Sequence, residues 1–131
     1  MNKIHAEVKE IQNSENLNIV TFAYKDSSFK MMSLDLNERV KSGARVIISF
    51  KPTAVAIAKN ISGELSYSNQ LKTKIISLEI GELLCSLKLR FYDVTLESII
   101  TTASQKRMNL EPNNEVTALI KSSDLFISEL L

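Results

Sequence analysis

The chain has 131 residues, with sixteen basic and fifteen acidic side chains, so its formal charge is close to zero. This length gives one ordinary domain or two very small ones, and the charge balance argues against broad binding of nucleic acid or of an anionic membrane. The N-terminal MNKIHAEVKE lacks the apolar region of a signal peptide, and no apolar run is long enough to span a bilayer. We therefore expect a soluble, cytoplasmic protein.

Short strands with alternating apolar residues are predicted through the first half of the chain. They cover Lys3–Gln12, Leu17–Tyr24, Ser28–Leu34, Ala44–Phe50 and Ala54–Ala58. The segment LNERVKSG, before the fourth strand, supplies a short turn. The polar stretch NISGELS, residues 60–66, is typical of a linker because it holds one of only three glycines.

The second half repeats this order of elements. Strands are predicted at Gln70–Ile80, Leu83–Phe91 and Val94–Ile100. The segment TTASQKRMNL, residues 101–110, is the helical-looking piece, with a threonine as its N-cap and EPNN at its end. Two further strands follow in EVTALIKSSDLFIS. The pattern predicts an all-β fold of two tandem OB-like five-stranded barrels, each with a short helix.

The two halves also resemble each other residue by residue. NKIHAEVKEI aligns with NQLKTKIISL, and VKSGARVIISFKPTAV aligns with LEPNNEVTALIKSSDL. The offset grows by three residues between the two alignments, which indicates a small loop insertion in the second half. We interpret the chain as a tandem duplication with units at residues 1–62 and 63–131. Units of about 60 residues are marginal alone and favour association.

Residues typical of catalysis are sparse. Cys85 is the only cysteine and His5 the only histidine, so no disulfide framework exists. Cys85 lies in an apolar stretch, where a small buried side chain is expected. The sequence shows no triad, no paired acids and no metal-ligand spacing, so we predict that the protein is not an enzyme and has no metal site of the ordinary kind.

The joint Lys121-Ser122-Ser123-Asp124 interrupts two apolar strands near the C-terminus. Serine and aspartate favour turns, so one interpretation is a solvated turn. The other is a set of converging donors for a ligand with many acceptor oxygens, because the joint offers hydroxyls, backbone amides and an ammonium group. The residues alone leave both interpretations open.

A family resemblance bears on this choice. SYSNQL, at residues 66–71, and VTALIKSSDL, at residues 116–125, resemble the opening and closing motifs of the molybdate-binding mop domain, a member of the TOBE group. Two such units in tandem, without a DNA-binding helix-turn-helix or a phosphate-binding glycine loop, are similar to the molbindins. The resemblance implies cytoplasmic binding of molybdate or tungstate for molybdenum storage, buffering or homeostasis.

The resemblance also implies which residues contact the oxyanion. In the second half they are Ser66, Tyr67, Ser68, Asn69, Thr101, Ser104, Lys121, Ser122 and Ser123, and in the first half Lys51 and Thr53. An alternative role for Asn69 is to fix the start of its strand instead of contacting the ligand. An alternative role for Thr101 is to cap the helix.

Two departures from the family pattern affect the expected site. Ser68 stands where the family has an arginine, and Arg107 or Lys106 is a candidate to replace the lost charge. In the first half, Leu34 lies about where Ser104 falls, and Pro52 removes a backbone N–H. We expect the first-half site to be weaker, altered or absent.

The family resemblance implies a homotrimer with ligands at the interfaces between subunits, and neither nucleic acid nor membrane as a partner. Two other functions stay open. One is a TOBE module that acts with a molybdate transporter or regulator. The other is an OB-type nucleic-acid-binding module, which would need aromatic side chains and a basic groove. Lys72, Lys74 and Lys88 are the nearest approach to a basic patch.

Overall fold

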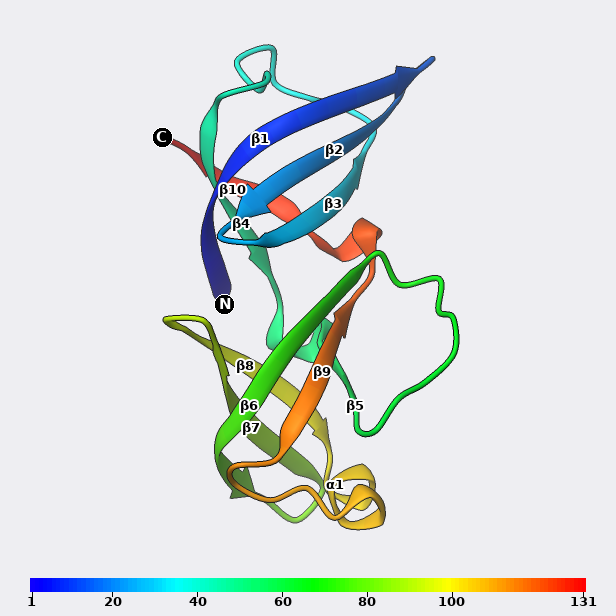
Figure 1. Cartoon of the computed structure of the whole chain (residues 1–131), viewed down its shortest axis with the longest axis vertical. Helices are drawn as coiled ribbons and strands as arrows, with labels where there is room; N and C mark the ends of the chain where they lie inside the picture. The colour runs from blue at the N-terminus through cyan, green and yellow to red at the C-terminus, as the bar shows by residue number, and fades with distance from the viewer.

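The protein is an elongated molecule of two curled five-stranded sheets joined end to end, described by a computed structural model of residues 1–131 (Figure 1). The predicted all-β class with two five-stranded sheets is confirmed. The first half contains β1 (Asn2–Ser14), β2 (Leu17–Tyr24), β3 (Ser27–Ser33), β4 (Arg45–Phe50), the 3₁₀ turn η1 (Pro52–Ala54) and β5 (Ala56–Ala58). The second contains β6 (Asn69–Ile80), β7 (Leu84–Phe91), β8 (Val94–Thr101), α1 (Thr102–Met108), β9 (Glu115–Ile120), η2 (Ser122–Asp124) and β10 (Phe126–Leu130).

Each half gives its last strand to the other half's sheet. We call the sheet with the strand order β10-β4-β1-β2-β3 the first unit, and the sheet with the order β5-β9-β6-β7-β8 the second unit. Figure 1 shows β10 beside β4 and β5 beside β9. The five strands expected from each half therefore do not build one sheet by themselves. Alternating apolar residues specify which face of a strand is buried, but they do not specify which sheet receives it.

The repeat is regular in the structure. β1, β2 and β3 begin at Asn2, Leu17 and Ser27, and each of β6, β7 and β8 begins 67 residues later, at Asn69, Leu84 and Val94. β4, η1 and β5 begin 70 residues before β9, η2 and β10. The first strands of both units carry a bulge at equivalent positions, Val8/Glu10 and Ile75/Ser77. The three extra residues lie between β8 and β9, in the segment that contains α1.

Only the second unit contains the expected α-helix. The equivalent segment of the first unit, residues 34–44, forms turns, so the prediction of a short helix in each barrel is wrong for that unit. This segment is three residues shorter than its counterpart in the second unit. In its turn the Asn37 side-chain oxygen accepts from the Arg39 amide (2.8 Å), and the Asn37 carbonyl accepts from the Val40 amide (2.9 Å). Asparagine side chains favour local turns of this kind.

A pair of asparagines joins the two units. Asn69 is fully buried at the start of β6, and it accepts from the Lys30 amide (2.8 Å) and donates to the Lys30 carbonyl (3.0 Å) in β3. Asn2, at the start of β1, makes the same two bonds with Glu97 in β8, at 2.8 and 2.9 Å. Each first strand is thus fixed to the third strand of the other unit.

The buried apolar side chains form one cluster of 24 residues drawn from both units. Val55, after η1, and Leu125, after η2, are buried in it at the points where the chain crosses between units. A shared core follows from the strand exchange and removes the difficulty that each half alone would be marginal. No helix of the protein has the length and apolar character that a bilayer crossing requires.

Candidate functional site

The two segments with the family motifs meet in one cavity. Its volume is about 230 Å³, and its lining consists of Met32, Ser66, Tyr67, Ser68, Lys121, Ser122 and Ser123. Residues 66–68 end the linker before β6, while Lys121 and the serines form the crossing from β9 to β10. The pairing of β6 with β9, which sets Asn69 opposite Ile120, brings the two segments together.

The polar side chains of this cavity have no partner within the chain. The hydroxyls of Ser66, Ser68, Ser122 and Ser123 make no side-chain hydrogen bond, and Lys121 makes no ion pair. The first hydrogen bond of η2 runs from the Asp124 amide to the Lys121 carbonyl (2.9 Å), so the amides of Ser122 and Ser123 precede the bonded turn. The cavity therefore offers hydroxyl, amide and ammonium donors together.

Asn69 lies beside this cavity but does not line it. Its side-chain nitrogen donates both hydrogens, to the Lys30 carbonyl and to the Ile120 carbonyl (3.1 Å), and its oxygen accepts from the Lys30 amide. Because both N–H donors are used inside the protein, the Asn69 side chain has no hydrogen left to donate to a ligand. Its geometry matches the competing interpretation, in which Asn69 fixes the start of the strand.

Thr101 and Ser104 lie at α1, at the far end of the second unit from η2 in Figure 1. The Thr101 hydroxyl caps the helix, since it accepts from the Ser104 amide (3.1 Å) and donates to the Ser104 hydroxyl (2.9 Å). Arg107 also donates to the Ser104 hydroxyl (3.2 Å). With two bonds accepted, Ser104 keeps its own hydrogen to donate outward, next to a guanidinium group.

Lys51 and Thr53 lie at η1, the counterpart of η2, and are not among the residues that line the 230 Å³ cavity. Pro52 supplies no amide at the position that Ser122 holds in η2. With the 67-residue spacing of the first strands, Met1 stands at the position of Ser68. The first-half counterpart thus has fewer donors than the second-half cavity.

Met32 is the lining residue that the sequence did not indicate. It comes from β3 of the first unit, and its side chain is 47% exposed. It reaches the cavity because β3 packs against η2, a contact that depends on the exchange of β10 into the first unit. No local pattern in the sequence signals that contact.

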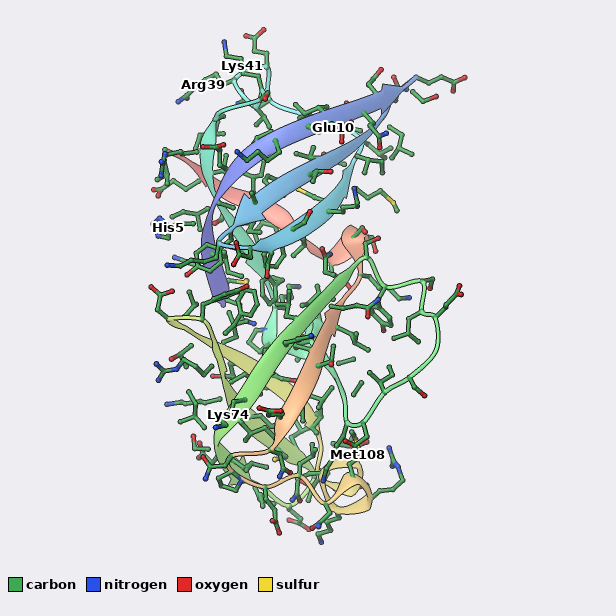
Figure 2. The ribbon with its side chains drawn as sticks, in the orientation of Figure 1. His5, Glu10, Arg39, Lys41, Lys74 and Met108 are labelled. Atoms are coloured by element: carbon green, nitrogen blue, oxygen red, sulfur yellow. The ribbon has the colours of Figure 1, made fainter.

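Cys85 and His5, the residue types most typical of catalysis, lie in different units. Cys85 is fully buried in β7, as expected for a small core side chain, and burial raises the pKa of its thiol. His5 lies on the exposed face of β1, in the other unit (Figure 2). No group of three or more histidine, cysteine, aspartate or glutamate side chains is arranged to hold a metal ion.

Comparisons with known proteins agree with this architecture. Residues 65–127 match the family model of the TOBE domain. A structure of the cytoplasmic molybdate-binding protein ModG with molybdate bound superposes with a TM-score of 0.91 at 19% identity, over 96% of this chain and 94% of that chain. A molybdate-binding protein from Sporomusa ovata aligns at 25% identity over 46% of this chain and 90% of that one, with a TM-score of 0.45. No curated protein matches the chain significantly in sequence.

The matched residues 65–127 contain both segments that line the cavity and exclude β1 to β5. The ModG structure matches both units. At 19% identity, this match establishes the fold alone. The second half of the chain is thus similar to the TOBE domain, and the chain as a whole has the two-unit fold of ModG.

Proposed function

We propose that this protein binds molybdate or tungstate in the cytoplasm and serves to store or buffer molybdenum. The observation that carries the proposal is the cavity in which four unpartnered serine hydroxyls and the Lys121 ammonium converge. A tetrahedral dianion has only acceptor oxygens, and a site for it needs several donors and about one positive charge. ModG, which shares the fold, is a molybdate-binding protein.

We further propose that the cavity is one half of a site that a second protomer completes. Ser66, Ser68, Lys121 and Ser123 are exposed, so water competes for them in the isolated chain. The predicted contacts Thr101 and Ser104 lie at the opposite end of the second unit and do not reach this cavity within one chain. A neighbouring subunit that places its α1 against the cavity supplies both hydroxyls. The predicted homotrimer meets this requirement.

In that arrangement Arg107 provides the charge that Ser68 lacks. Its guanidinium lies 3.2 Å from the Ser104 hydroxyl and makes no ion pair with a carboxylate. Charge-assisted hydrogen bonds are about twice as strong as neutral ones, so one such donor from the partner offsets the loss of the family arginine. Asn69 then acts by holding residues 66–68 in place rather than by contacting the anion.

The proposed duplication of residues 1–62 and 63–131 fits the same scheme. The matching bulges and the two asparagine contacts support two copies of one mop-like unit. Because η1 carries Pro52 and lacks serines, we propose that Lys51 and Thr53 form at most a weak site.

Isothermal titration with molybdate, tungstate and sulfate, together with light scattering for mass, tests the proposal. We expect molybdate and tungstate to bind the trimer, and molybdate at a hundred times its dissociation constant to stabilise it by about 2.7 kcal/mol. Absence of binding heat and of any change in melting temperature with millimolar molybdate or tungstate would overturn the function. Binding by a monomer would overturn the shared site alone.

A further inference from the structure

The outer face of the second unit holds a basic hollow that the proposed oxyanion site does not use. It has a volume of about 570 Å³ and lies over β6, β7 and β9, next to the start of the linker. Lys72 and Lys74 from β6 and Arg90 from β7 line it, together with Glu115 and Thr117 from β9. Figure 2 shows Lys74 on β6 in the lower half of the molecule.

The cations of this hollow are adjacent and unpaired. Lys74 and Arg90 are direct cross-strand partners, and Lys72 lies two residues from Lys74 on the same face. Lys74 is also opposite Glu115, yet none of the three cations makes an ion pair or a side-chain hydrogen bond. Like charges directly opposite each other destabilise a sheet. The Lys74–Arg90 pair is therefore unfavourable, and Glu115 is the one carboxylate in the lining that offsets the three cations.

The fold does not require this charge, because the first unit lacks it. The counterparts of Lys72, Lys74 and Arg90 are His5, Glu7 and Ala23, and Glu7 again has two direct partners, Ala23 and Arg45. Glu7 forms the only ion pair of the chain, 2.5 Å from Lys9. The same surface is thus locally neutralised in one unit and carries three cations against one carboxylate in the other.

We propose that the hollow formed by Lys72, Lys74 and Arg90 binds a small multivalent phosphate-type anion. Its volume is within the range of roughly 300–1,000 Å³ typical of small-ligand sites. No aromatic side chain lines it, so it offers no platform on which a nucleic acid base would stack. Three cations within one hollow suit a compact ligand with two or more negative charges, and Thr117 adds a hydroxyl donor.

Pyrophosphate is the probe that tests this site, by isothermal titration of the full chain at 0.15 M salt, where diffuse surface attraction is screened. The double variant Lys74→Gln/Arg90→Gln should bind pyrophosphate at least tenfold more weakly than the wild type. Lys88→Gln is the matched control, because Lys88 lies on β7 two residues from Arg90, is exposed, and does not line the hollow. It should change the affinity by less than twofold.

The outcomes separate this inference from the proposed function. Lys74→Gln/Arg90→Gln should leave the molybdate-induced shift in melting temperature unchanged, and Lys121→Gln should leave pyrophosphate binding unchanged. No pyrophosphate binding by the wild type, or an equal loss in Lys88→Gln, overturns the site. Tighter binding of a single-stranded oligonucleotide than of pyrophosphate also overturns it. As a second readout, Arg90→Gln should raise the melting temperature without ligand, because it removes a like-charge pair.

Discussion

The two units share a backbone plan, yet they differ in the groups that carry chemistry. Both have the same bulge, the same crossing 3₁₀ turn and the same asparagine at the start of the first strand. At the crossing, the second unit presents Lys121-Ser122-Ser123, and the first presents Lys51-Pro52-Thr53. Only the second unit has α1. Features that hold the units together are retained in both, while donor groups are concentrated in one.

The first half is needed for the second-half cavity even where it supplies no donors. β3 of the first unit provides Met32 to the cavity and Lys30 to the asparagine contact, and β10 cannot pair without β4. The second half alone would lose β5 and leave β10 without a partner. The first unit is thus part of the scaffold that positions the second-half cavity.

Removing the buried asparagines should give the largest effect. Asn69→Ala leaves the amide and carbonyl of Lys30 and the Ile120 carbonyl without their partner, so we expect the free energy of unfolding to fall by about 3–4 kcal/mol. Asn2→Ala breaks two bonds instead of three and should cost about 2 kcal/mol. Urea denaturation at one protein concentration measures both. An equal or larger loss in Asn2→Ala would contradict the ranking.

Changing the lysines at the two crossings tests whether the units differ in function. Lys121→Gln removes a charge-assisted donor from the cavity and should weaken molybdate binding by about 2 kcal/mol, roughly thirtyfold. Lys51→Gln makes the same change at η1 and should alter affinity by less than about twofold. Titration calorimetry measures both values. A comparable loss in Lys51→Gln would show that the first unit also holds a working site.

How much of this architecture the sequence revealed depends on the range of the interactions involved. Alternation predicted most strand positions, and the motifs predicted the six residues from 66–68 and 121–123 that the cavity brings together. The exchange of β5 and β10 was missed because both possible sheets satisfy the same alternation. The α-helix expected in the first unit is absent, and the segment that would hold it is three residues shorter than the one that forms α1 and folds as turns around Asn37. Met32 joins the cavity only through the exchange.

Restoring the family arginine should have a smaller effect than removing Lys121. Ser68→Arg adds a guanidinium at the exposed rim of the cavity, where solvent screens part of its charge. We expect molybdate to bind more tightly by about 1 kcal/mol, roughly fivefold. The gain should be greater in an Arg107→Gln background if the partner's α1 supplies the missing charge. An unchanged affinity in both backgrounds would contradict the role given to these positions.

The smallest effect should come from the hairpin turns that meet between the units. Tyr24, in the first unit, donates its hydroxyl to the Asp93 carboxylate in the second, whereas Phe91, the counterpart of Tyr24, has no hydroxyl to return the bond. Burial, and then the bond to Asp93, raise the pKa of Tyr24 to about 12, and the same bond lowers the pKa of Asp93. The contact therefore favours the neutral phenol with the ionised carboxylate.

The pH dependence of Tyr24→Phe tests this contact. The stabilisation from Asp93 is present above the usual aspartate pKa of about 4 and is lost as pH falls through the lowered value. The stabilisation from Tyr24 is present below about pH 10 and is lost as pH rises toward about 12. Tyr24→Phe should therefore lower the melting temperature slightly near neutral pH, with the difference shrinking at both extremes. Tyr92→Phe is the matched control, because the ring of Tyr92 packs beside Tyr24 while its hydroxyl accepts only one long bond, from Ser27 at 3.4 Å. A pH-independent difference for Tyr24→Phe would contradict the bond between the neutral phenol and the ionised Asp93 as its source.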